Sequence, residues 1–539
     1  SEGIVTNTLG TSNFVAGVNA GNSITSGGNY NTVVGDEAGT AITTGDNNVA
    51  VGYNSLIANT TASANTALGD NSLRDNTTGA SNTAVGHASL LNNTTADNNT
   101  AVGYYALLAN TTGAGNVAMG YQALDANTTA SYNTAIGTSS LSANTTGAEN
   151  TALGKSAMEA NTTGSQNVAI GKGAFDVNTT GSNNVAVGYN ALDANTTASN
   201  NTAIGTSSLS ANTTGDNNTA VGYSSLQANT TGSQNAAIGT NALLSNTTGI
   251  DNIAVGMFSL GSNTTGNRHT AIGKNALYAN TTGNDNTAVG KSALGVNTTG
   301  YENAALGYNS LDANTTGNKN TALGTFALTN NTTASENTAV GYDSLGDNTT
   351  GIKNTALGNA ALAANTTAEK NTAVGQSALY AVTTGGFNAA LGHQAGFGVT
   401  TGSNNVFVGH RAGYYTNYLI SGTTSTFLGS YSYPTADNAT QCVVLGHAVG
   451  GANGYTTIGH GGSDIRAAHG NVTWSTVSDE RYKKDITTST AGLSFINDLT
   501  PRTWNYKTLG ELPTTFNAYE ADSTEVFKNT QTNHGFIAQ

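Results

Sequence analysis

Residues 99–115, Asn-Thr-Ala-Val-Gly-Tyr-Tyr-Ala-Leu-Leu-Ala-Asn-Thr-Thr-Gly-Ala-Gly, contain the unit from which most of this chain is built. Gly103 closes the apolar run of this unit, and equivalent glycines recur every 17 residues from Gly35 to Gly409 without insertion or deletion. Constant spacing is typical of a solenoid, because each coil must lie on the coil before it. Seventeen residues are too few for a helix pair. The sequence therefore predicts an all-β parallel β-solenoid, or β-roll, of 17-residue coils. At a strand spacing of about 4.8 Å, the rod would be on the order of 105 Å long.

The short strand before each glycine has one large and one small face. The residue just before the glycine is aliphatic or Met, whereas the residue two places before it is Ala in every repeat from Ala50 to Ala390. Because strand side chains alternate, we expect the large face to fill the core of the coil, joined by the Leu four places after the glycine, such as Leu56. The small face would let another backbone approach around a symmetry axis. The alternative is that Ala fits a narrow coil interior.

An Asn-Thr-Thr triplet occurs in 19 consecutive repeats, from Asn59 to Asn365. In a secreted eukaryotic protein each triplet would be a glycosylation site. Stacked Asn and Thr also form hydrogen-bonded ladders, as in cross-β assemblies, and Asn tolerates tight corners. We favour the ladder. The ladder residues give way to Ile42, Val382 and Val399 at the ends of the repeat region, where a solenoid needs different coils.

The composition excludes several classes of protein. The chain has 539 residues, of which 9% are charged, and a formal net charge of −14. A nucleic-acid-binding protein needs basic surfaces, which this balance does not provide. The single cysteine, Cys442, excludes an intrachain disulfide and a zinc–thiolate cluster. We expect no cofactor.

The repeat resembles the head repeats of trimeric autotransporter adhesins, in which small and aliphatic residues alternate around Asn-Thr-Ala-Val-Gly motifs. That resemblance implies a trimer of parallel β-rolls, although the adhesin units are shorter. It leaves open a bacterial surface adhesin, which would need a membrane anchor that this sequence does not show. We assign residues 1–30 to a lead-in and residues 31–413 to the shaft.

The period breaks in residues 414–475, which we interpret as an irregular β region at the tip. Exposed aromatic residues in irregular loops suit ligand binding, and they equally suit a core that caps the rod. Four histidines directly follow motif glycines, and on a three-fold axis they could form ion-binding rings. Because Tyr, Lys and Thr occur at the same position, we favour ordinary surface histidines and predict no metal site. The candidate binding residues are Tyr414, Tyr415, Tyr418, Tyr431 and Tyr433, and the histidines are His393, His410, His447 and His460.

The last part of the chain, residues 476–539, differs again in composition. Its segments Ser-Asp-Glu-Arg-Tyr-Lys-Lys-Asp-Ile from Ser478, Gly-Leu-Ser-Phe-Ile from Gly492, Pro-Arg-Thr-Trp from Pro501 and Gly-Phe-Ile-Ala-Gln from Gly535 follow one another in order. This series resembles the C-terminal intramolecular chaperone domain of phage tail spikes and fibres, the endosialidase type. The resemblance implies a small α+β domain that trimerises, assists folding of the β stalk and then cuts itself off. The family domain continues beyond this segment, so we expect these residues to form part of it.

Ser478 is the candidate nucleophile for this cleavage, and Lys483 is its candidate base. A Ser–Lys dyad needs a lysine whose pKa is lowered, which partial burial can provide. The resemblance places the cut beside Ser478. The alternative is that these residues form a turn or helix cap with solvated charges. Apart from self-cleavage we predict no enzyme.

These observations together predict a trimeric phage tail fibre that projects from the virion and attaches to a host cell. Its partners would be two further copies of itself, a glycan or outer-membrane receptor, and tail or baseplate proteins, with no nucleic acid. It would be extracellular on the virion, or alternatively on a bacterial surface. A glycan-cleaving tail spike is the third alternative. That activity needs paired carboxylates, and acids such as Asp125, Glu159 and Asp312 form no constant pair along the repeats.

Overall fold

The computed structural model describes residues 8–414, 420–470, 475–476, 502–504, 521–524 and 533–535. The chain divides into two compact units, Ser1–Thr476 and Val477–Gln539. Within the described ranges there is no helix, and therefore none with the length and apolar character needed to span a bilayer.

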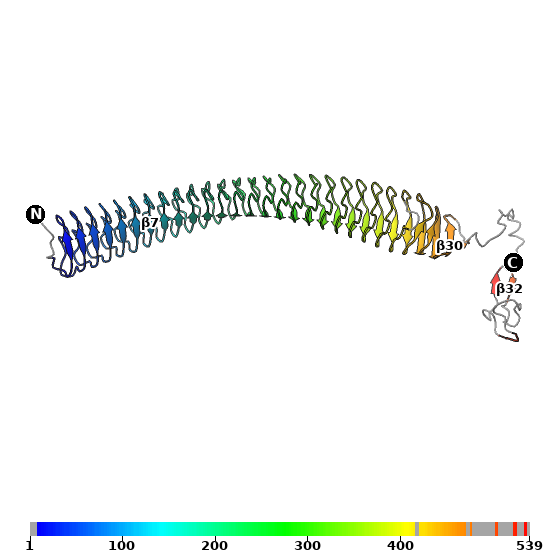
Figure 1. The fold of residues 1–539 in the computed structure, drawn as a ribbon, viewed down its shortest axis with the longest axis horizontal. Helices are drawn as coiled ribbons and strands as arrows, with labels where there is room; N and C mark the ends of the chain where they lie inside the picture. Colours follow the sequence, from blue (N-terminus) through cyan, green and yellow to red (C-terminus); the bar gives the residue numbers. More distant parts are fainter. Residues whose placement is uncertain are drawn as a thin grey trace. The chain divides into compact units, whose positions relative to one another are not determined.

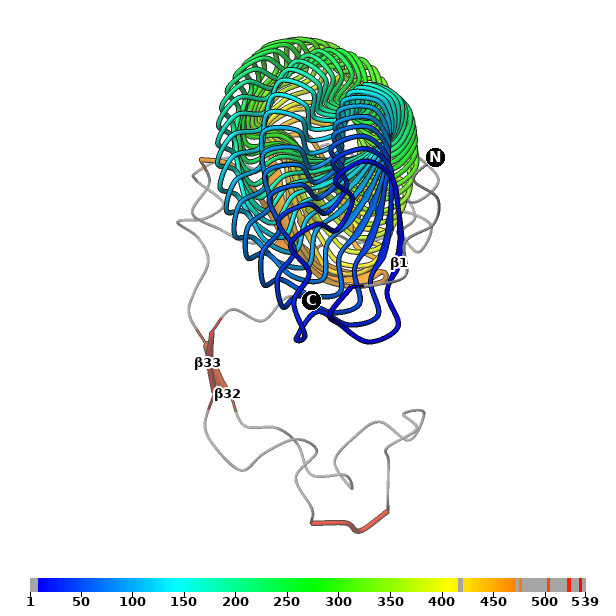
Figure 2. The same ribbon diagram turned by 90° about the vertical axis from the view of Figure 1, so that its left-hand side faces the viewer.

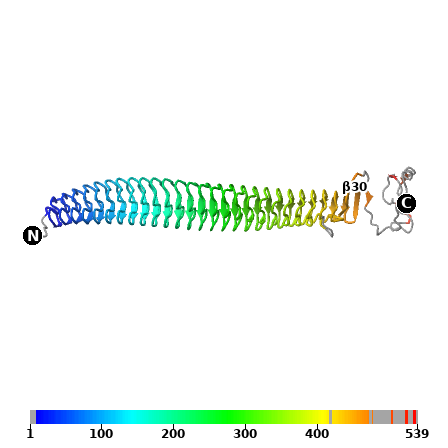
Figure 3. The same cartoon turned by 90° about the horizontal axis from the view of Figure 1, so that it is seen from above.

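The first unit is a parallel β-solenoid of about 26 stacked coils, which confirms the predicted fold class. In the repeat region, each coil contributes one three-residue strand to a single sheet. The strands begin with β1 (Phe14–Ala16), β2 (Thr32–Val34) and β3 (Val49–Val51) and then recur every 17 residues to β24 (Val406–Val408). Successive strands pair in parallel, and Ala101 of β6 (Thr100–Val102) lies opposite Ala118 of β7 (Val117–Met119). The strands form a row along one side of the stack (Figures 1 and 3), and the coils follow one another around a common interior (Figure 2).

The sheet continues beyond the strict repeat. Strands β25 (Thr426–Leu428), β27 (Val443–His447) and β29 (Tyr455–His460) extend it in parallel, and β30 (Ser463–Ala468) turns back antiparallel on β29. Strand β31 (Ser475–Thr476) pairs with β30, and β26 (Tyr433–Pro434) forms a separate pair with β28 (Gly450–Gly451). In the second unit, β32 (Arg502–Trp504) pairs antiparallel with β33 (Asn533–Gly535).

The strand side chains face the opposite way from our first prediction. Ala101 in the middle of β6 is fully buried inside its coil, whereas Thr100 and Val102 on either side of it are partly exposed. The same pattern recurs along the sheet, with Ala buried in each strand from β3 to β23 (Ala389–Leu391). The interior also holds the fully buried Leu107 and Asn110, so only a small side chain fits beside them. The prediction of an alanine face at a symmetry axis is therefore wrong, and the narrow-interior alternative is correct.

The glycine that closes each strand lies against the next coil of the same chain, not against another chain. Gly103 has a φ of 135°, and a Cβ built there would lie 2.5 Å from the carbonyl oxygen of Gly120 in the next coil. No side chain can be accommodated so close to a backbone oxygen. The close approach that the small residues indicated is therefore the contact between consecutive coils.

The leucine four places after the glycine lies in the core, as predicted. Leu107 is fully buried with a φ of 54°, in the left-handed region, and Leu56 and Leu73 repeat this geometry. Such a backbone costs a branched residue roughly 1–2 kcal/mol. Burial of the leucine side chain, worth about 1.5–3 kcal/mol, offsets that strain. Met158 and Phe175 take the same buried position in their coils.

The predicted asparagine ladder is present and fully buried. The Nδ2 group of Asn110 donates to Oδ1 of Asn93 in the preceding coil and to the carbonyl oxygen of Gly113, both at 2.9 Å. Thr111 contributes through its hydroxyl, which donates to the carbonyl oxygen of Thr128 at 3.0 Å. Because the asparagine amides are consumed inside the rod, they offer no surface for glycan attachment, in agreement with our preference for the ladder.

A second asparagine ladder, which was not among the predictions, runs just before the strands. The backbone N–H of Asn99 donates to Oδ1 of Asn82, and Nδ2 of Asn99 crosses the coil to the carbonyl oxygen of Gly113, both at 2.9 Å. His269 replaces one asparagine of this ladder. Its Nε2 lies 2.6 Å from the carbonyl oxygen of Gly283, and its Nδ1 accepts from the N–H of Asn286 at 3.2 Å.

The neutral ring of His269 therefore reproduces both bonds of the amide that it replaces. Burial lowers the pKa of His269 to about 4, against the effect of its two backbone hydrogen bonds.

Candidate functional site

The outward faces of strands β2 to β25 form a continuous surface, which we call the outward stripe. It has two columns: the first residue of each strand, most often Thr, and the third residue, which is Val, Leu, Ile or Met. We call the second of these the aliphatic column. Neither column contains a charged residue in any of these strands. The most exposed members of the aliphatic column are Leu68, Met119, Leu153, Ile204, Ile238, Ile272, Leu306, Leu323, Leu357, Leu391, Val408 and Leu428.

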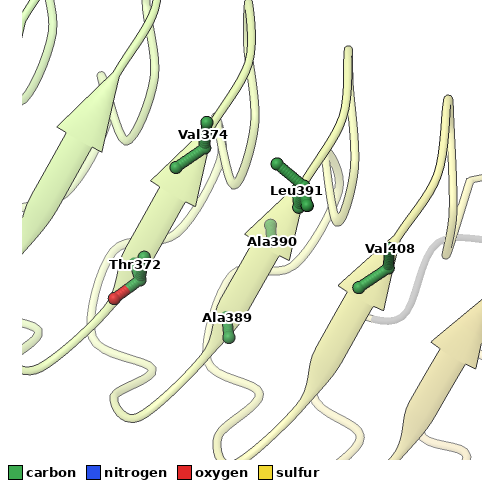
Figure 4. A pocket seen from close by; sticks show the side chains of 6 residues that line it. All are labelled: Thr372, Val374, Ala389, Ala390, Leu391 and Val408. Atoms are coloured by element: carbon green, nitrogen blue, oxygen red, sulfur yellow. The ribbon is translucent and has the colours of Figure 1, made fainter.

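A shallow apolar hollow of about 220 Å³ lies in the stripe near its C-terminal end. Val374, Leu391 and Val408 occupy the same end of three successive strands, and Thr372 and Ala389 occupy the other (Figure 4). Leu391 is 53% exposed. The hollow occurs where Ala389 takes the place of a larger first residue, so the stripe has local relief and could receive an apolar side chain.

A second surface follows the residue directly after each strand-closing glycine, and we call it the ring column. Tyr104 stacks between His87 and Tyr121, with ring centroids 5.1 and 5.6 Å apart. Farther along, the ammonium nitrogen of Lys291 lies 5.3 Å from the ring centroid of Tyr308, in the position of a cation–π contact. The column was visible in the sequence as the place where Tyr, Lys and His recur every 17 residues. We had considered this variation only as a reason to regard the histidines as ordinary surface residues.

The structure brings the four predicted histidines and one of the predicted tyrosines into a single line on this surface. The ring centroids of His393 and His410 are 5.1 Å apart, those of His410 and Tyr431 are 5.0 Å apart, and those of Tyr431 and His447 are 5.9 Å apart. His447 and His460 stack at 5.1 Å on paired strands. We had predicted these tyrosines and histidines as two separate sets.

The other predicted tyrosines are distributed differently. The guanidinium carbon of Arg411 lies 5.0 Å from the ring centroid of Tyr414 and 6.0 Å from that of Tyr431, so this arginine joins the two rings. Tyr433 packs its ring over the backbone of Gly450, the next strand of the small second sheet. Tyr415 and Tyr418 lie outside the described residues.

The electrostatics of this line oppose the binding of a cation near Arg411. Partial desolvation, together with the charges of His393 and Arg411, lowers the pKa of His410. Among the described residues, no three His, Cys, Asp or Glu side chains gather closely enough to hold a metal ion. The line is better suited to ring stacking and to hydrogen bonding with a polar ligand.

The acidic residues Asp125, Glu159 and Asp312 share one column of the solenoid. Glu159, Asp176 and Asp193 occupy the same position in three successive coils, and Asp125 and Asp312 occupy it elsewhere. Burial raises the pKa of Asp176, and the neighbouring Glu159 and Asp193 raise it further.

The predicted cleavage residues Ser478 and Lys483 lie outside the described residues, so their dyad stays a prediction. Residues 478–539 match the family model described as chaperone of endosialidase. This match covers the segments on which the resemblance was based. No curated protein and no solved structure matches the chain.

Proposed function

We propose that this chain forms the shaft of a homotrimeric phage tail fibre, folds with the help of its C-terminal chaperone domain and attaches the particle to a host cell. The carrying observation is the order of the two parts: a long β-solenoid followed by residues 478–539, which match the chaperone of endosialidase family. A parallel solenoid pairs strands that lack local partners, so its nucleation is slow. A chaperone that gathers three chain ends would raise their effective concentration.

The proposed self-cleavage uses Ser478 as the nucleophile and Lys483 as the base. Removal of the domain after folding would leave a shaft that cannot readily refold once opened, which is kinetic stability. The fibre would be extracellular on the virion.

The test of processing is the native mass of the full chain and of its Ser478→Ala variant, with Ser463→Ala in β30 as the matched control. We expect a trimer that releases a C-terminal piece beginning beside Ser478 in the wild type and the control, and an uncleaved trimer in Ser478→Ala. A monomeric wild-type chain would overturn the proposed fibre. A trimeric wild type that is never cleaved would overturn only the proposed processing.

For host attachment we propose that the line of rings from His393 to His460 contacts a glycan or another polar receptor on the cell envelope. Aromatic and imidazole rings provide stacking faces and hydrogen-bonding edges for such ligands. The test is binding of the labelled chain to isolated bacterial envelopes. We expect Tyr431→Ala to weaken binding several-fold and Tyr223→Ala, an exposed ring in the middle of the rod, to leave it unchanged. Equal binding by both variants would contradict this assignment.

A further inference from the structure

We infer that the outward stripe is the face on which copies of this chain pack against one another, parallel and in register. The inference rests on the proposed function, because it names the surface through which the three copies would meet. It replaces the alanine face, which lies inside the coil.

The outward stripe leaves a large apolar area in contact with water. Leu68, near the N-terminal end, is 47% exposed, and Leu357, near the C-terminal end, is 46% exposed. Twelve of the 24 residues of the aliphatic column are at least 36% exposed, so the column offers apolar surface on the order of 1,000 Å² in each copy. A stable interface needs about 800 Å² per partner. Uninterrupted apolar surface of this extent marks an interaction site.

The 17-residue repeat restricts which partner can cover the outward stripe. A partner that covers the stripe over its whole length must present side chains at the same axial spacing for more than 20 coils. Another copy of this chain meets that condition, because its strands recur at the same 17-residue interval from β2 to β24. A partner with a different repeat would fall out of register within a few coils.

The negative charge of the chain also restricts which face two copies can share. Two chains with a formal net charge of −14 repel each other, so they can associate only through a face that keeps their carboxylates apart. The outward stripe is free of charge in every strand from β2 to β25, whereas the charged residues of the coil lie at its corners, as for Lys319 and Glu302.

The geometry of the stripe favours a common axis parallel to the rod. The aliphatic column lies along one end of the strands. If this end of the strands in each of three copies faces a common three-fold axis, aliphatic side chains of the three copies pack against one another in every coil. Two stripes placed flat about a two-fold axis parallel to the rod would instead set the aliphatic column of one copy against the Thr column of the other. In the three-fold arrangement, a coil with a short residue such as Ala389 lies beside the same coil of the other copies. The hollow beside Leu391 then receives a side chain from the neighbouring copy.

The first test places carboxylates in the stripe of the full chain. The stripe variant is Leu306→Asp, Leu323→Asp and Leu357→Asp together, and the matched control is Thr316→Asp, Thr333→Asp and Thr367→Asp at exposed corner positions. We expect sedimentation equilibrium to give three chain masses for the wild type and the control, and one chain mass for the stripe variant. A stripe variant that stays trimeric would overturn the inference and leave the proposed fibre intact. A monomeric wild type would overturn both.

The second test does not depend on the stripe variant folding. Leu323→Cys places one thiol in the aliphatic column, while the native Cys442 is fully buried. In a parallel, in-register assembly each Leu323→Cys thiol meets its own counterpart, so mild oxidation should give covalent dimers, whereas Thr333→Cys should give none. Failure of Leu323→Cys to cross-link would contradict the parallel register. A further sample mixes Leu323→Cys copies with copies that carry a cysteine near the opposite end of the stripe. Cross-links that form only in this mixture would show an antiparallel pair or a lateral contact. Either result would overturn the parallel, in-register packing.

Discussion

The coils in the middle of the solenoid and the coils at its two ends fill the same interior with different side chains. A middle coil combines the inward Ala220 with the left-handed Leu226 and the ladder residue Asn229, all buried. Near the N-terminal end the corresponding positions hold Val33, Gly39 and Ile42. Near the C-terminal end the inward residue is Phe407 and the left-handed residue is Gly413.

These exchanges conserve volume. A Cβ added to Gly39 would lie 2.8 Å from the side chain of Ile42 and 3.2 Å from that of Val33, and one added to Gly413 would lie 2.5 Å from the ring of Phe407. The larger inward residues Val33 and Phe407 therefore fit because glycine occupies the left-handed position of the same coil. Glycine also removes the backbone strain at that position.

The exchange of asparagine for an apolar residue at the ladder position shows how the hydrogen-bonded ladder ends. Each ladder asparagine donates to the coil before it and accepts from the coil after it. Asn365 is followed by Val382, and its buried Oδ1 has no hydrogen-bond partner. An orphaned acceptor costs about 1–3 kcal/mol. Apolar residues at Ile42, Val382 and Val399 limit that cost to one coil and seal the ends with hydrophobic packing.

The largest expected effect distinguishes glycines in the stacked coils from those in the end region. Gly222→Ala would set a Cβ 2.7 Å from the carbonyl group of Gly239, so we expect a loss of more than about 4 kcal/mol. Gly461 has a φ of 60° and no atom within 4 Å of an added Cβ, so Gly461→Ala should cost only about 1 kcal/mol. Thermal unfolding of both variants measures the difference, and equal losses would contradict the close-contact explanation.

The next effect compares the middle of the ladder with its end. Asn229 donates to Asn212 and to Gly232 and accepts from Asn246, each at 2.8 Å. Asn229→Val breaks all three bonds, and we expect it to cost about 3 kcal/mol.

The matched variant is Asn365→Val. Asn365 makes two hydrogen bonds rather than three, and the substitution also removes its orphaned Oδ1, so the expected cost is about half as large. Hydrogen exchange of the two coils measures both values. If Asn365→Val loses as much stability as Asn229→Val, the number of ladder hydrogen bonds does not explain the difference between the two coils.

A third experiment converts a middle coil into an end coil. Leu226→Gly removes a fully buried side chain while relieving a φ of 53°, and we expect a net loss of about 2–3 kcal/mol. Adding Ala220→Val, after the pairing of Val33 with Gly39, should recover about 1 kcal/mol because the new methyl groups fill part of the cavity. If the double variant is less stable than Leu226→Gly, the volume exchange does not explain the end coils. Denaturation midpoints supply the comparison.

The smallest effect tests how the ladder tolerates His269. The unfolded ring takes up a proton below about pH 6.5, whereas the buried ring does so only at about pH 4. Its contribution to stability is therefore complete above about pH 6.5 and is lost as the pH falls toward 4, by about 2 kcal/mol at pH 5. His269→Asn should remove this part of the pH dependence. Unfolding of the two proteins between pH 7 and pH 4.5 provides the measurement, and parallel pH profiles would contradict the neutral-ring assignment.

Much of this fold could be predicted from the spacing alone. The glycine in every 17 residues predicted one coil per repeat. The leucine of each repeat predicted an apolar core, and the Asn-Thr-Thr triplet predicted a hydrogen-bonded ladder. Side-chain size could not decide which strand residues point into the coil. A three-residue strand has one large and one small face, and either can point inward while the width of the interior is unknown. The repeats contained a better signal. The middle residue of the strand stays Ala from Ala50 to Ala390, while the flanking residues vary among Thr, Val, Ala, Ile, Leu and Met. The position that never varies is the one confined on all sides.

The ring column was harder to predict for a different reason. His410 is the first residue after its glycine, whereas Tyr431 is the second residue after Gly429, and their rings meet as those of His87 and Tyr105 do in the strict repeat. Contacts between two different positions of neighbouring coils are not seen when each repeat position is considered by itself. The cleavage residues Ser478 and Lys483 were indicated only by resemblance, and their geometry remains a prediction.

The uniform contact between consecutive coils has a consequence for how such a molecule can change over generations. Since an interior coil meets the same surfaces above and below, unequal recombination between repeats could delete or duplicate whole coils without creating a new junction. Length would then vary in integer steps of about 4.8 Å, and a lineage could adjust its reach without redesigning either end.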